Sequence, residues 1–133
     1  MLRELTGVRV YIAVGYTDLR MGIDGLTALV QQHFQMDPMS KDLYLFCGRR
    51  RDRIKGLLWE GDGFLLLYKR FESGGIQWPR NADEMQELSS QQYRWLMEGL
   101  SIVQPKALKD AAGYRGSIKT IRQNREFTDR FER

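Results

Sequence analysis

The pattern of hydrophobic and polar positions predicts first a strand and then a helix. Apolar side chains alternate with others over residues 8–14, which is the period of a half-buried β-strand. After a glycine-containing break, apolar residues recur at helical spacing up to about Phe34. Asp18 and Asp24 are the two candidates for the N-cap of this helix, and Asp37-Pro38 ends the segment.

Three apolar runs in the middle of the chain predict a β-meander. Residues 43–47 are apolar throughout, residues 52–59 alternate, and residues 64–70 are apolar until Lys69. A strand without a polar face is usually buried on both sides. Glycine and aspartate tolerate positive φ, so Glu60-Gly61-Asp62-Gly63 is the predicted turn between the second and third strands. A short fourth strand is predicted at Ile76–Trp78, before Pro79.

The second helix has the clearest start signal in the chain. Ser89 as N-cap and Gln92 three residues later predict a capping box, and Gly99 predicts the C-terminal stop. The elements together predict an α+β fold, with a mostly antiparallel sheet of about five strands and two main helices. We expect residues 1–104 to form this single domain. Residues 105–133 are expected to form a basic tail that is flexible or becomes helical on a partner.

The predicted strands bury more surface than two helices on one face would cover. We expect the two helices to cover one face of the sheet, so the other face needs a cover from the tail or from another chain. This pattern predicts a homodimer through an apolar sheet face, or a protein partner.

The excess of positive charge lies in the C-terminal tail. The net charge is +4, and residues 1–104 hold 13 basic and 13 acidic side chains, so the whole excess lies in residues 105–133. A moderately basic balance of this kind favours polyanion partners only weakly. No apolar run approaches the roughly 20 residues of a membrane span, so no membrane association is expected. The N-terminus shows no signal-peptide pattern, and a cytoplasmic location is therefore expected.

A single cysteine and a single histidine restrict the chemistry that is available. Cys47 lies in an apolar run, so we expect a buried and inert thiol. His33 alone excludes sites that need two histidines, including most zinc chemistry. The sequence contains no P-loop. We therefore expect no metal, no cofactor and no enzyme activity.

A group of cations between two apolar runs is the candidate binding site. Arginine forks match phosphate oxygens and keep their charge at any working pH, and backbone contact of this kind positions a protein without reading sequence. Exposed Tyr68 and Trp59 would stack on bases. The alternative is a solvated turn, neutralised by Asp52, Glu60 and Asp62. The candidate nucleic-acid contacts are Arg49, Arg50, Arg51, Arg53 and Lys55, extended by Lys69 and Arg70, with Lys119, Arg122 and Arg125 as weaker candidates.

Acidic side chains offer a second chemistry. Carboxylates gathered in space hold magnesium for phosphoryl transfer, which is how nucleases and transposases work. The acidic candidates are Asp18, Asp24, Asp52, Glu60 and Asp62, of which a nuclease would use Asp18, Asp24 and Asp62. Aspartate also serves helix caps and turns very often. We favour that interpretation over a metal site.

Several motifs, in a fixed order, resemble one protein family. They are Thr-Asp-Leu-Arg at 17–20, Gly-Ile-Asp-Gly-Leu at 22–26, Gly-Arg-Arg-Arg-Asp-Arg-Ile-Lys at 48–55, Leu-Trp-Glu-Gly-Asp-Gly-Phe at 58–64, Tyr-Lys-Arg at 68–70 and Gln-Trp-Pro at 77–79. Over about residues 8–100 the chain resembles the small accessory protein of the sixty-six family of bacterial insertion sequences. That protein is encoded by the second open reading frame of the element and is called TnpB there. It is unrelated to the RNA-guided nuclease of the same name.

The resemblance implies a role in transposition, beside a larger transposase that carries the strand-transfer carboxylates. It transfers no catalytic residue to this chain. We therefore predict an accessory protein that binds DNA at the insertion-sequence ends, the transposase, or both, without a catalytic site of its own. One alternative is a protein–protein adaptor or dimer that does not touch DNA. The other is a small metal-dependent nuclease.

Overall fold

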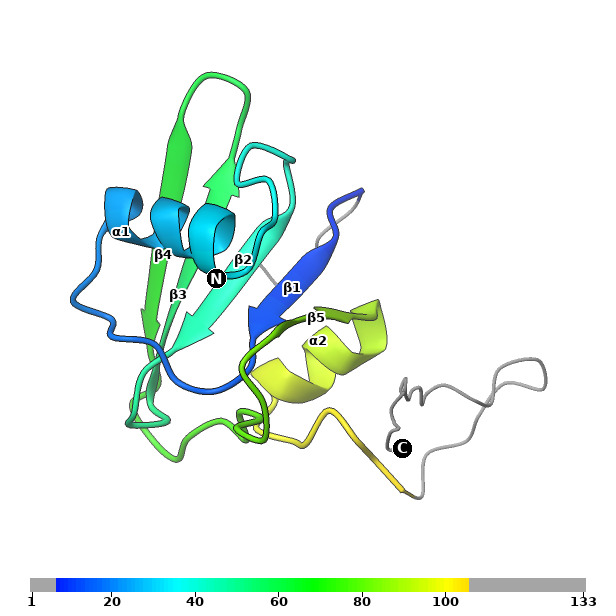
Figure 1. Cartoon of the computed structure of the whole chain (residues 1–133). Helices are drawn as coiled ribbons and strands as arrows, with labels where there is room; N and C mark the ends of the chain where they lie inside the picture. Colours follow the sequence, from blue (N-terminus) through cyan, green and yellow to red (C-terminus); the bar gives the residue numbers. More distant parts are fainter. Residues whose placement is uncertain (1–6, 106–133) are drawn as a thin grey trace. The chain divides into compact units, whose positions relative to one another are not determined.

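The computed structural model describes residues 7–105 of the chain (Figure 1). Nearly all of the predicted basic tail, 105–133, lies outside the described residues, as do its candidate contacts Lys119, Arg122 and Arg125. The elements in chain order are β1 (Val10–Ala13), α1 (Ile23–Ala28), the π-helical turn η1 (Leu29–His33), β2 (Leu43–Cys47), β3 (Arg53–Trp59), β4 (Phe64–Arg70), β5 (Met85–Leu88) and α2 (Ser90–Met97).

The five strands form one mixed sheet in the order β4-β3-β2-β1-β5. β1 and β2 are parallel, with Val10 opposite Leu43, and every other neighbouring pair is antiparallel. Two parallel neighbours need a crossover connection, which the segment containing α1 and η1 provides. The predicted α+β fold, with a mostly antiparallel sheet of about five strands and two main helices, is confirmed.

One predicted strand is wrong, and the sheet takes its fifth strand from elsewhere. Residues 76–78 form no strand. Ile76 and Trp78 instead bury their side chains in the core, and the Trp78 indole N–H donates a 2.9 Å hydrogen bond to the Ala13 carbonyl. The fifth strand is β5, which pairs antiparallel with β1. Its sequence, Met-Gln-Glu-Leu, lacks the β-branched and aromatic residues that are enriched in strands, so pairing with the edge of β1 decides its conformation.

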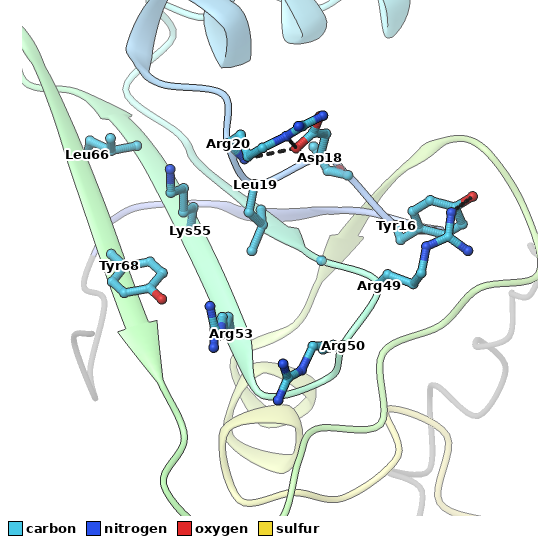
Figure 2. A pocket seen from close by; sticks show the side chains of 12 residues that line it. Tyr16, Asp18, Leu19, Arg20, Arg49, Arg50, Arg53, Lys55, Leu66 and Tyr68 are labelled. Atoms are coloured by element: carbon cyan, nitrogen blue, oxygen red, sulfur yellow. Dashed lines mark hydrogen bonds and ion pairs between the residues drawn. The ribbon is translucent and has the colours of Figure 1, made fainter.

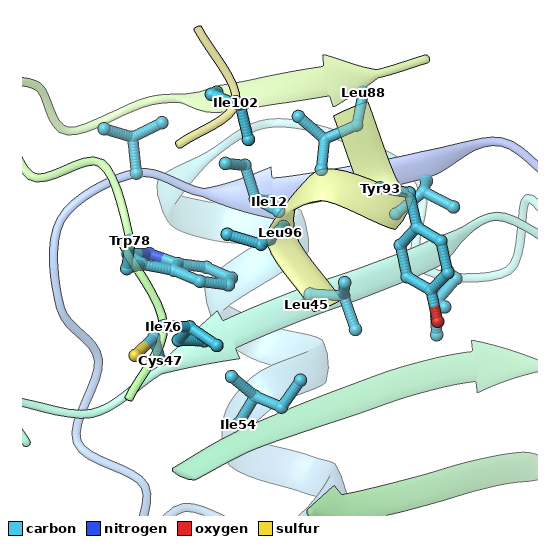
Figure 3. Packing of buried hydrophobic residues seen from close by; sticks show 13 residues of the cluster. Ile12, Leu45, Cys47, Ile54, Ile76, Trp78, Leu88, Tyr93, Leu96 and Ile102 are labelled. Carbon is cyan, nitrogen blue, oxygen red and sulfur yellow. The ribbon is translucent and has the colours of Figure 1, made fainter. Parts of the chain in front are cut away.

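The two helices pack on opposite faces of the sheet. Successive strand residues point to opposite faces. Leu45 and Cys47 of β2 belong to one buried cluster, with Tyr93 and Leu96 of α2 (Figure 3). The alternate residues Tyr44 and Phe46 belong to another, with Leu26 of α1 and Val30 of η1. The expectation that both helices share one face and leave the other uncovered is therefore wrong.

The helix starts were predicted correctly for α2 and wrongly for α1. The Ser89 hydroxyl accepts a 3.1 Å hydrogen bond from the Gln92 backbone N–H, and the Ser89 N–H donates to the Gln92 side chain at 3.0 Å, which confirms the capping box. Gly99 follows the helix with φ +83°, as a helix stop requires. The N-cap of α1 is Gly22, which offers no side-chain cap, so neither predicted aspartate caps this helix.

Candidate nucleic-acid interface

The loops that follow β1 and β2 meet at one edge of the sheet. Because these two strands are parallel, their carboxyl ends lie at the same edge. The Thr17 backbone N–H donates to the Cys47 carbonyl at 2.8 Å and joins the two loops directly. The loop after β1 spans residues 14–22, and residues 48–52 after β2 form what we call the arginine loop. The fold thus brings together polar side chains of two loops that are about 30 residues apart in the sequence.

An open groove of about 830 Å³ lies between these loops and strands β3 and β4, and we call it the basic groove (Figure 2). Five of the side chains that line it are basic and one is acidic, so its lining carries a net positive charge. The lining residues are Tyr16, Thr17, Asp18, Leu19, Arg20, Gly48, Arg49, Arg50, Arg53, Lys55, Leu66 and Tyr68.

The floor of the groove continues a row of core residues. Leu57 is fully buried in the cluster beneath α1, and Leu66 lies opposite it on β4. Residues two apart on a strand share a face, so Lys55, with Tyr68 opposite, extends the same row. The face changes from apolar to basic along this row, and its polar members line the groove. Figure 2 shows Lys55 and Tyr68 as neighbours on β3 and β4.

Hydrogen bonds hold the wall that faces this floor. The Lys55 ammonium donates to the Met21 carbonyl at 2.9 Å and so connects β3 to the segment before α1. Asp18 accepts from the Arg20 guanidinium at 2.9 Å and 2.7 Å and from the Arg20 backbone N–H at 3.0 Å. Hydrogen bonds from the Arg20 side chain, and then from its backbone, lower the pKa of Asp18 to about 2. The one acidic group in the lining is therefore ionised at neutral pH and already paired.

The arginine loop is only partly neutralised by its own carboxylate. Asp52 lies 3.8 Å from Arg50 Nη2 and 3.5 Å from Arg53 Nε, at or beyond the limit of a good hydrogen bond. One carboxylate thus faces two guanidiniums, and the Arg50 side chain is 77% exposed. Glu60 and Asp62, the other acids of the neutralised-turn interpretation, lie in the β3–β4 turn at the opposite end of β3. Of the three acids in that interpretation, only Asp52 lies near the arginines, and its contacts with them are long.

Two arginine side chains lie close to the ring of Tyr16 beside the groove. The Arg49 guanidinium carbon lies 4.2 Å from the Tyr16 ring centroid, and its Nη2 donates to the Tyr16 hydroxyl at 2.7 Å. Arg80 lies 5.7 Å from the same centroid and donates to the Gly48 carbonyl at 2.7 Å. Tyr16, Arg49, Arg51 and Arg80 line a second hollow of about 470 Å³, which we call the arginine pocket. It adjoins the basic groove, because Tyr16 and Arg49 line both.

The structure brings together most of the predicted contact residues. Arg49, Arg50, Arg53 and Lys55 line the basic groove, and Arg51 lines the arginine pocket. These five side chains therefore belong to one continuous basic surface.

The proposed extension of the site along β4 is not brought into the groove. Lys69 lies opposite Ile54, on the face that packs against α2, and its ammonium is 5.0 Å from the Phe71 ring centroid. Arg70 lies opposite Arg53 on the groove face, but its guanidinium pairs with Glu72 at 2.9 Å. Neither residue lines the basic groove.

Of the two aromatic residues expected to stack on bases, Tyr68 lines the groove and Trp59 does not. Trp59 lies at the other end of β3, where its ring meets Phe64 edge-on at 4.9 Å.

Three residues of this surface were not predicted as contacts: Tyr16, Arg20 and Arg80. Tyr16 directly precedes the Thr-Asp-Leu-Arg motif at 17–20 and Arg20 is its last residue, and the resemblance assigned neither side chain a role. Arg80 had no signal in the sequence. The tertiary structure places it, because Trp78 is anchored on Ala13 and the Gly15 N–H donates to the Pro79 carbonyl at 2.9 Å.

The carboxylates named for a metal site do not come together. Within residues 7–105, no group of three or more His, Cys, Asp or Glu side chains is arranged to hold a metal ion. Asp18 pairs with Arg20, Asp24 lies in the first turn of α1, and Asp62 lies in the β3–β4 turn. Cys47 is fully buried, and burial raises the pKa of its thiol to about 11, as expected of an inert cysteine. In the same part of the chain, no helix is long and apolar enough to cross a membrane.

Comparison with known proteins adds a family to this geometry. The family model described as "IS66 Orf2 like protein" matches residues 8–107. Two curated relatives come from Sinorhizobium fredii, and both are described as uncharacterized proteins. One, y4jC, is 33% identical over 100 residues, which cover 75% of this chain and 86% of the relative. The other, y4hO, is 32% identical over 106 residues, which cover 80% and 92%. No solved structure matches the chain.

Proposed function

The chain belongs to the IS66 Orf2-like family of insertion-sequence accessory proteins, and from this premise we propose that it binds DNA through the basic groove. In this proposal the larger transposase of the same element carries out the strand chemistry. The accessory protein holds DNA, and with it the transposase, in the bacterial cytoplasm. In this role no side chain of the accessory protein takes part in a catalytic step.

The charge of the groove is the observation that supports this proposal. Arg20, Arg49, Arg50, Arg53 and Lys55 line it, and the one carboxylate among the lining residues is paired with Arg20. Asp52 neutralises Arg50 and Arg53 only in part, through contacts of 3.8 Å and 3.5 Å, so the groove keeps an excess of positive charge that attracts a polyanion. Guanidinium forks also form paired hydrogen bonds with phosphate oxygens.

Binding of this kind has a recognisable thermodynamic signature. Each phosphate that a cation neutralises releases condensed counterions, so the affinity falls steeply as salt rises. Contacts to phosphates set the position of a protein on DNA and carry no direct sequence information. We therefore expect duplexes with and without the insertion-sequence end to bind this protein with similar affinity.

The test is a titration of the full chain against both duplexes over a range of salt concentrations, by fluorescence anisotropy. Arg53→Gln removes a groove cation, and Lys69→Gln is the matched control on the opposite face. Arg53→Gln should weaken binding to both duplexes equally and reduce the salt slope by about 1. Lys69→Gln should change neither quantity much. Equal effects of the two substitutions would contradict binding through the groove.

The same titration, repeated with transposase, addresses the protein partner. The adaptor alternative requires an uncovered sheet face, whereas α1 and α2 pack on opposite faces of the sheet. An adaptor that does not touch DNA predicts a transposase complex that survives high salt and is insensitive to Arg53→Gln. A ternary complex that weakens with both salt and Arg53→Gln supports the proposal.

A further inference from the structure

Tyr68 lines the basic groove but has no role in the phosphate contacts proposed above. The residue is 53% exposed. It lies opposite Lys55 in the β3–β4 pair, and Figure 2 shows Arg53 on the same side of the strands. Within residues 7–105, its ring stacks on no other ring and on no cation, whereas Arg49 covers the ring of Tyr16. An aromatic face is thus open to solvent among cations.

We propose that the basic groove takes an unpaired DNA strand, with one base stacked on Tyr68 and the flanking phosphates on Arg50 and Arg53. This inference rests on the proposed function and names the form of DNA that the groove selects.

The chemistry of the lining favours a single strand over a duplex. A duplex keeps its bases inside the helix and presents phosphates and sugars, which would leave the ring of Tyr68 without a partner. An unpaired strand exposes base faces, and a positively charged groove with an aromatic platform is the usual arrangement for binding one. Leu19 and Leu66 add apolar surface to the same lining, which suits bases better than phosphates.

The size of the groove leads to the same conclusion. Its volume of about 830 Å³ falls within the roughly 300–1,000 Å³ range of small-molecule sites. A few nucleotides of single strand fit such a space. A duplex would lie across its mouth, where its phosphates reach the guanidiniums of Arg50 and Arg53 but no base face meets the ring of Tyr68.

The experiment compares two DNA probes on the full chain by fluorescence anisotropy at one salt concentration. One probe is a thymidine oligomer of about 16 nucleotides, and the other is a hairpin duplex with the same number of phosphates. The unsubstituted protein should bind the oligomer more tightly. Tyr68→Leu should weaken oligomer binding by at least about fivefold, the lower end of what one base–aromatic stack contributes, and should leave duplex binding unchanged. Tyr68→Trp, which keeps a stacking surface, should bind the oligomer at least as tightly as the unsubstituted protein.

The outcomes separate this inference from the proposed function. Duplex binding as tight as oligomer binding, or equal losses on both probes with Tyr68→Leu, overturns the selection of a single strand while the groove remains a DNA site. Loss of oligomer binding by Tyr68→Trp as well as Tyr68→Leu would also overturn it. Failure of both probes to bind, or no effect of Arg53→Gln on either, contradicts the proposed function itself.

Discussion

The guanidinium of Arg49 lies over the ring of Tyr16, 4.2 Å from its centroid, and donates a 2.7 Å hydrogen bond to its hydroxyl. The two residues come from different loops, one after β1 and one after β2. This contact holds a groove cation in place before any ligand arrives. Tyr16 is 54% exposed, so the contact can be altered without opening the core.

Substitution of Tyr16 should weaken DNA binding through Arg49. An exposed cation–π contact contributes about 0.5–1 kcal/mol, so Tyr16→Leu should lower the affinity by about two- to fivefold. Tyr16→Phe keeps the ring and should lose less. The double-mutant cycle with Arg49→Gln checks the mechanism. If Tyr16 acts by placing Arg49, the two losses are not additive, and additive losses would argue against that role.

The titration of Asp18 should report its pairing with Arg20. The pKa of Asp18 is about 2 in the folded protein, below its unfolded value of about 3.9. Stability from this pair is therefore fully present above about pH 4 and is lost as the pH falls towards 2. Arg20→Gln should return the pKa towards its ordinary value. The pKa of Asp18 in both proteins is measured by following its carboxyl chemical shift by NMR over pH. An unchanged midpoint in Arg20→Gln would show that another group holds the pKa down.

Removal of the groove carboxylate should increase DNA affinity. Asp18→Asn eliminates the one acidic charge among the described lining residues and frees the Arg20 guanidinium for a phosphate. The salt slope should become steeper by about 1, since one more phosphate is neutralised. Asp62→Asn removes the same charge from the β3–β4 turn, at the far end of β3, and serves as the control. Similar gains from both substitutions would indicate a general charge effect and not a contact in the groove.

A side chain at Gly75 should disturb the arginine loop. A Cβ at this position would lie 2.9 Å from the Arg51 carbonyl oxygen, which also accepts a 2.8 Å hydrogen bond from the Ile76 N–H. Gly75→Ala should therefore destabilise the fold by about 1–3 kcal/mol, a typical cost of overpacking. Gly63→Ala is the matched control, because a Cβ there meets nothing within 4 Å. Urea denaturation measures both, and equal stability of the two variants would show that the loop accommodates the methyl group.

The capping box of α2 should be measurable as stability. Ser89→Ala removes the acceptor for the Gln92 N–H and should cost about 1 kcal/mol. Ser90→Ala, one residue into the helix, should cost much less, because no capping hydrogen bond involves its side chain. Thermal unfolding of the two variants, followed by circular dichroism, gives the comparison. A loss at Ser90 as large as that at Ser89 would contradict the assigned cap.

The parts of this fold that depend on residues close together in the sequence were predictable from the sequence. The capping box needs only Ser89 and Gln92, and the strands of the meander follow from apolar runs bounded by turns. Strand β5 was not predictable in this way. Its residues have no marked strand preference, and the free hydrogen-bonding edge of β1 selects their conformation.

The sequence by itself determined that a dense group of arginines would follow a buried strand and that no pair of histidines could form a site. Only the tertiary structure decided which of those cations share a groove. Parallel pairing of β1 with β2 brings Tyr16 and Arg20 to the arginine loop, and the burial of Trp78 carries Arg80 there. The antiparallel register of β3 and β4 places Lys69 on the opposite face. Strand pairing is a long-range choice of backbone hydrogen bonds, and local patterns of side chains do not encode which strands become neighbours.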